Sequence, residues 1–220
     1  MEQRTAAVSV RNVTKRFGPV LANDKVCLDI YRGEILALLG ENGSGKTTLM
    51  NMLSGIYYPD EGEIYINGKP VSISSPKESF HLGIGMIHQH FKLVDVFTAA
   101  ENIILGLDEK LDMKSAIRKI RKICDQYGFD IDPNQKIYDM SVSQKQTIEI
   151  IKVLYRGADI LILDEVLGLL DQNIVPEEEI LQLMAMKSDD MHMIMTGQVI
   201  SDGIMEQADD VYEICIKKEG

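Results

Sequence analysis

The chain has 220 residues, a formal net charge of −11 at pH 7, and 45% hydrophobic residues. Its length suits one domain with room for a small inserted lobe, and the apolar fraction is sufficient for a full core. The negative charge opposes nonspecific attraction to phosphate backbones, so we expect no nucleic-acid partner.

Compartment signals in the sequence favour the cytoplasm. No stretch approaches the roughly 20 apolar residues that span a bilayer, and no apolar run near the N-terminus predicts a signal peptide. The cysteines Cys27, Cys124 and Cys215 are widely spaced and odd in number, which predicts neither a disulfide framework nor a metal site. We therefore expect a cytoplasmic protein that reaches a membrane only through a partner.

The first half of the chain predicts strands with one helix among them. Residues 35–39 form an unbroken apolar run, which suits a strand buried on both faces. A helix is expected to follow the glycine-rich segment after this strand and to reach about residue 54. Alternating or short apolar runs mark the other expected strands, at residues 7–10, 26–30, 63–66 and 85–88.

The second half begins with a helical stretch and then returns to alternating strands and helices. Periodic apolar positions from about residue 98 to 151 predict helix, broken once at Asp132-Pro133. Helices are expected from residue 176 and at residues 204–208. Strands are expected at residues 158–163, 191–195 and 211–216. This alternation predicts an α/β fold with a helical insert at about residues 95–155.

The segment at residues 40–48, Gly-Glu-Asn-Gly-Ser-Gly-Lys-Thr-Thr, lies between the expected strand and helix. Backbone N–H groups can converge on an anion at such a helix N-terminus. In this pattern Lys46 reaches the β- and γ-phosphate oxygens and Thr47 offers its hydroxyl to Mg²⁺, whereas the alternative is a plain glycine-rich turn. The expected nucleotide-binding residues of this loop are Gly40, Asn42, Gly43, Ser44, Gly45, Lys46, Thr47 and Thr48.

Acidic residues that could complete a nucleotide site follow the apolar strand at residues 158–163. Asp164 is placed to hold Mg²⁺ or its water, and Glu165 could orient or deprotonate an attacking water. The alternative is a solvated strand end. Gln89 follows the expected strand at residues 85–88 and could reach a metal ion, although its spacing alone favours an ordinary polar loop residue.

At these motifs the chain resembles the ATP-binding cassette of ABC transporters, in the form found in bacterial sugar and nucleoside importers. The resemblance covers about residues 8–165. Its most specific carriers are residues 40–48, 53–62, 83–91, 99–103 and 155–165. It implies a P-loop NTPase core with a mixed sheet and a helical subdomain insert, which binds ATP and Mg²⁺.

The resemblance also implies roles for particular residues. Phe17 would stack on adenine, and Glu165 would be the catalytic general base. Gln89 would sense Mg²⁺ and water. Thr47, Gln89 and Asp164 would be the metal-binding residues. The helical subdomain at about residues 95–155 would contact a membrane permease, which places the chain at the inner face of the cell membrane. Two cassettes would form a dimer, and for this chain the resemblance implies a homodimer as one form of that assembly.

Three departures from the family pattern bear on function. The signature loop of the family has a glycine where this chain has Ser143, and a side chain there should weaken the sandwich dimer. Residues 166–171 replace the expected Pro-Thr and aspartate-containing loop. No histidine follows Met195, where the family has a γ-phosphate-sensing histidine. These changes predict impaired ATP hydrolysis with ATP binding retained.

The tail from about residue 161 to 220 is similar to the C-terminal half of ATP:corrinoid adenosyltransferases. A fusion, an engineered chimera and a divergent cassette all fit this pattern. We expect residues 1–220 to form one nucleotide-binding domain with a divergent C-terminal segment at 166–220. The favoured function is the nucleotide-binding subunit of an ABC-type importer. The alternatives are a noncatalytic ATP-binding scaffold and an adenosyltransferase-like enzyme.

Overall fold

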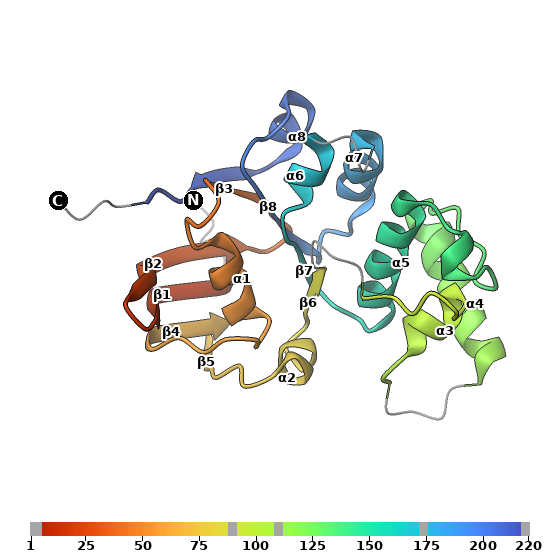
Figure 1. The fold of residues 1–220 in the computed structure, drawn as a ribbon, viewed down its shortest axis with the longest axis horizontal. Coiled ribbons are helices and arrows are strands. Elements are labelled where there is room, and N and C mark those ends of the chain that lie inside the picture. Colours follow the sequence, from red (N-terminus) through yellow and green to blue (C-terminus); the bar gives the residue numbers. More distant parts are fainter. Residues whose placement is uncertain (1–5, 88–91, 108–111, 172–175, 217–220) are drawn as a thin grey trace.

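The computed structural model describes residues 6–87, 92–107, 112–171 and 176–216. Its strands form two sheets, and a group of helices lies at one end of the molecule (Figure 1). Within the described ranges, no helix combines the length and apolar character that crossing a bilayer requires. The predicted α/β class is confirmed, with its strands divided between one antiparallel and one parallel sheet.

The antiparallel sheet has the strand order β2-β1-β4-β5. Strands β1 and β2 pair along most of their length and are longer than the sequence predicts, because register shifts in β1 carry the pairing past polar residues that break the apolar alternation. Between β4 and β5, Asn67 and Gly68 form the predicted hairpin turn. The strands are β1 (Ala6–Phe17), β2 (Val20–Tyr31), β4 (Glu61–Ile66) and β5 (Lys69–Val71).

The five-stranded sheet has the order β6-β7-β8-β3-β9, and each neighbouring pair is parallel. Its central strands β7 and β8 are buried along their whole length, because helices and the first sheet cover both faces. The carboxyl ends of these strands consequently meet at one edge. The strands are β3 (Ile35–Leu39), β6 (Ile84–Ile87), β7 (Ile160–Leu163), β8 (His192–Gly197) and β9 (Asp210–Glu213).

Alternate residues of the parallel strands pack into two different cores. In β7, Ile160 and Ile162 join a core with α1 (Lys46–Leu53) and the antiparallel sheet. Leu161 and Leu163 join a second core with helices on the other face. Those helices include α5 (Val142–Tyr155), α6 (Val166–Asp171), α7 (Glu177–Met186) and α8 (Asp202–Gln207), while α2 (Pro76–His81) precedes β6.

The predicted helical stretch is divided more often than the sequence indicates. It contains α3 (Ala99–Ile104), α4 (Met113–Tyr127), a 3₁₀ turn (Ile137–Asp139) and α5, which together enclose their own apolar core at the right of Figure 1. The sequence predicted a single break in this stretch, at Asp132-Pro133, and that prediction was wrong because the structure has more than one. Gly128, in the left-handed conformation at φ +68°, already ends α4.

Glu34 is a buried acid at the turn between β2 and β3, with 3% of its surface exposed. Its Oε2 accepts a hydrogen bond from the Tyr31 N–H at 2.5 Å, whereas its Oε1 has no hydrogen-bond partner. Burial, followed by the nearby Asp210 and Asp209 at the start of β9, raises the pKa of Glu34 from 4.5 to about 7. Below about pH 7 the folded chain therefore favours the protonated carboxyl.

We predict a pH dependence of stability that Glu34→Gln removes. Because the folded pKa lies above the unfolded one, the stabilisation is complete below about pH 4.5 and is lost as pH rises through about 7. The loss is on the order of 3 kcal/mol at most. Urea unfolding at pH 5 and pH 8 measures it. The exposed Glu61→Gln is the control, and an equal pH dependence in both variants would contradict the assignment.

Candidate functional site

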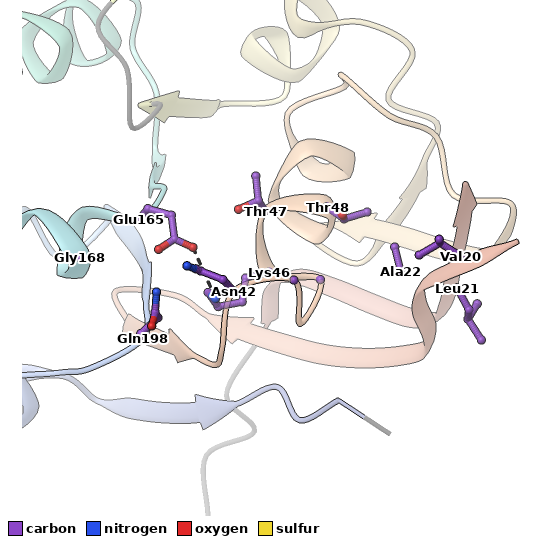
Figure 2. A pocket seen from close by; sticks show the side chains of 12 residues that line it. Val20, Leu21, Ala22, Asn42, Lys46, Thr47, Thr48, Glu165, Gly168 and Gln198 are labelled. Atoms are coloured by element: carbon purple, nitrogen blue, oxygen red, sulfur yellow. Dashed lines mark ion pairs between the residues drawn. The ribbon is translucent and has the colours of Figure 1, made fainter. Parts of the chain in front are cut away.

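The glycine-rich segment at residues 40–45 connects β3 to α1 at the carboxyl edge of the parallel sheet. The ends of β7 and β8 reach the same edge, and the Gly40 N–H donates to the Gly197 carbonyl at 3.1 Å. A cavity of about 450 Å³ opens there (Figure 2). Its lining residues are Val20, Leu21, Ala22, Asn42, Gly43, Gly45, Lys46, Thr47, Thr48, Glu165, Gly168 and Gln198.

The loop backbone requires glycine at particular positions. Gly45 has φ +97°, and a Cβ there would lie 2.3 Å from the Ala22 carbonyl oxygen. A Cβ at Gly40 would likewise lie 2.6 Å from the Ile214 carbonyl oxygen. Gly45 also precedes α1 without a side-chain cap, so the first N–H groups of this helix are left for another acceptor.

Lys46 is enclosed by the loop that precedes it, with 3% of its surface exposed. Its Nζ donates to the carbonyl oxygens of Gly40 at 2.7 Å and Glu41 at 3.1 Å. It also forms an ion pair with Glu165 Oε1 at 3.5 Å, drawn as a dashed line in Figure 2. A buried ammonium is thus paired with a carboxylate of the segment that follows β7.

Two hydroxyl groups reach the carboxylate of Asp164. Thr47 Oγ1 donates to Asp164 Oδ1 at 3.4 Å and Thr196 Oγ1 donates to the same oxygen at 3.0 Å. Burial raises the pKa of the Asp164 carboxyl above its ordinary value, and the charge of Glu165 raises it further, while the hydrogen bonds from Thr196 and Thr47 lower it. Glu165 adopts φ +57°, which is unusual for a residue with a side chain.

The structure brings most of the predicted site residues together. Residues 40–48 form the loop and first turn of α1, and Asp164 and Glu165 lie opposite them. Ser44 points its Oγ into the buried loop, where that atom has no hydrogen-bond partner. Gln89, the remaining predicted metal-binding residue, lies outside the described residues.

Phe17, predicted to stack on adenine, is not one of the described residues that line the cavity. Its ring is 41% exposed at the end of β1 and packs edge-on against Tyr57, with 5.0 Å between the ring centroids. Val20, Leu21 and Ala22 of β2 line that side of the cavity instead. The stacking role of Phe17 stays a prediction.

Two residues of the β8 end were missed from the sequence. Gln198 lines the cavity and lies near Asn42 and Glu165 in Figure 2. Thr196 contacts Asp164. The available signal was topological: a strand that pairs with both the loop-bearing strand and the Asp-Glu strand must end beside the same site.

Ser143, the residue that departs from the expected signature loop, lies in the first turn of α5. Its Oγ donates a short hydrogen bond to Glu179 Oε1 of α7. Ser141 caps the same helix by accepting from the Gln144 N–H, and the Gln144 side chain bonds back to the Ser141 N–H. The segment therefore folds as a capped helix start, with the extra hydroxyl committed to α7.

Sequence comparison places these motifs in a known group. The model of the ABC transporter family matches residues 23–168. The chain is 52% identical over 183 residues to a nucleoside import ATP-binding protein, NupA, of Lactococcus lactis, and 49% identical over 181 residues to a guanosine import ATP-binding protein, NupO, of Bacillus subtilis. Each alignment covers 80% of this chain and 35% of the relative, so the chain spans about a third of their length.

Solved structures share the fold along nearly the whole chain. The ADP conformation of MJ1267, an ATP-binding cassette of an ABC transporter, superposes with a TM-score of 0.83 and 22% identity, covering 95% of this chain and 87% of that one. Among the described residues after position 166, strands β8 and β9 belong to the same sheet as β3. The similarity of the tail to corrinoid adenosyltransferases receives no support from these relatives.

We predict that Gly45→Ala destabilises the chain more than Gly43→Ala. Both glycines have positive φ, but a Cβ at position 43 meets nothing within 4 Å, whereas at position 45 it collides with the Ala22 backbone. The alanine at 43 should cost about 1 kcal/mol from its backbone conformation alone. The alanine at 45 should cost at least about 2 kcal/mol more, because β2 must move. Urea unfolding of the three proteins measures this, and equal midpoints for the two variants would refute the tight loop contact.

Proposed function

We propose that this chain, which belongs to the ABC transporter family, binds ATP with Mg²⁺ in the cavity beside α1 and hydrolyses it slowly as the nucleotide-binding part of an importer. The observation that carries the proposal is the meeting of Lys46 and Thr47 with Glu165 and Asp164 across the sheet edge. These four side chains come from two segments far apart in the chain. Their types match phosphate binding, metal binding and water activation.

The phosphate groups of ATP would lie against the loop backbone. Unpaired N–H groups at the start of α1 and the ammonium of Lys46 are suited to a polyanion. Lys46 now donates to two loop carbonyls, so its position is fixed before any ligand arrives. A preorganised cation of this kind spends little entropy when it binds an anion.

The oxygen atoms near Thr47 fit a magnesium ion. The Thr47 hydroxyl and the Asp164 carboxylate lie 3.4 Å apart, and hydroxyl and carboxylate oxygens are the donors that Mg²⁺ accepts. When bound there with the nucleotide, Mg²⁺ would neutralise charge on the phosphates. Thr47 and Asp164 would hold it, and Gln89 is the third proposed contributor.

Glu165 is the proposed general base. Its side chain lines the cavity and forms an ion pair with Lys46, and a carboxylate in this place can accept a proton from a water at the γ-phosphate. Gln198 lines the same cavity and could hydrogen-bond that water or a phosphate oxygen without adding charge. No histidine follows Met195 in this sequence, whereas the family pattern has one after this strand, and this difference supports slow hydrolysis.

Partners are proposed by relation to the importers that the chain matches. The nucleoside and guanosine import proteins are about three times as long as the aligned part, so the solute and the assembly are proposals. The α3–α5 group at about residues 95–155 is the proposed permease-contacting subdomain, and Val96, Leu105 and Tyr138 expose apolar surface there. The chain would then lie at the cytoplasmic face of the membrane.

We predict that Lys46→Ala abolishes ATP binding, because it removes the only side-chain cation among the described residues that line the cavity. Loss of a charge-assisted contact to phosphate should weaken affinity by at least about a hundredfold. Equilibrium titration with ATP and Mg²⁺ measures it. The exposed Lys122→Ala in α4 is the control. Unchanged affinity in Lys46→Ala would refute the site.

We predict that Ser143→Gly increases phosphate release and dimer formation. The substitution removes the hydroxyl bonded to Glu179 and restores the close backbone approach that the family uses between cassettes. An increase in turnover of roughly tenfold or more is expected, since one recovered transition-state contact has that scale. A phosphate-release assay and analytical ultracentrifugation with ATP measure both effects.

Ser115→Gly is the matched control, because Ser115 lies in the first turn of α4, away from the cavity. If wild-type turnover already equals that of a cassette with the family glycine, the prediction fails. Clean ATP binding with no phosphate release in either protein would favour the noncatalytic scaffold instead. A spectral change on mixing with ATP and a reduced corrinoid would favour the transferase.

A further inference from the structure

Thr196 is a buried polar residue in the centre of the parallel sheet. It has 0% of its surface exposed and lies in β8, where the three residues before it, Met193, Ile194 and Met195, belong to the apolar cores. Its Cα is paired with that of Leu38 in β3, one residue before the end of that strand. A polar side chain at such a position needs partners, and those it has are both at the nucleotide site.

The Thr196 hydroxyl makes two hydrogen bonds of opposite sense. Its proton goes to Asp164 Oδ1 at 3.0 Å, and its oxygen accepts the backbone N–H of Glu165 at 2.7 Å. A hydroxyl has one proton, so these bonds are mutually consistent and use the donor fully. One atom therefore contacts both the proposed metal ligand and the backbone of the proposed base.

The backbone of Glu165 is the part of the site that most needs support. Its φ of +57° lies in the left-handed region, where residues other than glycine are disfavoured. The bond from its N–H to Thr196 holds this conformation, which directs the side chain toward Lys46. Without the acceptor, the N–H would be unpaired in a partly buried turn.

The carboxylate of Asp164 is oriented by the same hydroxyl. Both hydrogen bonds described for this group go to Oδ1, one from Thr196 in β8 and one from Thr47 in α1. Two donors on one oxygen fix the rotation of the carboxylate plane. Hydrogen bonds of this kind behind a metal ligand set its orientation and affinity.

We propose that Thr196 is a positioning residue of the ATP site, whose single hydroxyl orients the Asp164 carboxylate and the Glu165 backbone together. The inference rests on the proposed function, because it assigns these two acids to metal binding and catalysis. It makes β8, and not only the phosphate loop and β7, a determinant of Mg²⁺-dependent nucleotide binding. Loss of the hydroxyl should leave the phosphate loop intact.

The test compares Thr196→Val, which keeps the shape and removes the hydroxyl, with Thr196→Ser, which keeps the hydroxyl. ATP affinity is measured with Mg²⁺ and with EDTA, together with kcat and KM for phosphate release. In the valine variant we expect affinity in EDTA within about twofold of wild type. The increase in ATP affinity that Mg²⁺ produces should fall by about tenfold or more, and kcat should fall by a similar factor. The serine variant should recover both.

Thr14→Val is the matched control, since Thr14 is a buried threonine of β1 whose hydroxyl accepts from the Lys25 N–H away from the site. An unchanged Mg²⁺ gain and kcat in Thr196→Val would overturn the inference. An equal loss of affinity in EDTA and in Mg²⁺, not recovered by serine, would also overturn it, because it would mark a purely structural role.

If the valine variant does not fold, Thr196→Cys replaces it under the same criteria, because its thiol is of similar size and bonds weakly. Wild-type protein that binds no ATP in either condition would overturn the proposed function and this inference with it. Wild-type binding with a normal Thr196→Val variant would overturn the inference alone. The binding measurements hold even where hydrolysis is too slow to follow.

Discussion

The parallel pairing of β7, β8 and β3 is the constraint on which the site depends. Because β8 hydrogen-bonds to both neighbours, the residues that follow all three strands must emerge at one edge. Thr47 and Asp164, 117 residues apart in the chain, thereby come within 3.4 Å of each other. No local propensity in either segment could produce this contact. The apolar character of the strands, which drives them into a sheet covered on both faces, is also what assembles the polar site at its end.

Charge balance then decides which side chains can occupy that edge. An isolated ammonium as buried as Lys46 would be costly, and the loop carbonyls and Glu165 offset that cost. Asp164 is similarly buried, and the hydroxyls of Thr47 and Thr196 compensate for lost water. The buried charged side chains of the site are therefore each paired within it. A polyanionic ligand would exchange those partners for its own oxygens, and the residues need little rearrangement to receive it.

The sequence predicted those parts of the fold in which local pattern and tertiary context agree. The apolar runs at β3 and β7, the loop after β3 and the acids after β7 have unmistakable patterns, and the cassette resemblance that they supported is confirmed by the family match. The parts that failed have weak local patterns. The full length of β1 and β2 depends on cross-strand pairing through bulges, and α6 has no start signal after Glu165. Thr196 lies just after the predicted strand at residues 191–195 and was given no role, because its contact with Asp164 exists only when β7 lies beside β8.

The C-terminal segment shows why sequence divergence need not divide a fold. Its motifs depart from the cassette pattern, yet β8 and β9 flank β3 and complete the sheet. Asp209 accepts from the Ile35 N–H at 2.8 Å, and the Ile214 carbonyl lies where a Cβ on Gly40 would collide. The phosphate loop is thus packed directly against the segment that looks least like its family. A substitution in that segment can change the shape of the loop without touching any of its residues, so the divergent tail and the preserved loop must be treated as one structural unit.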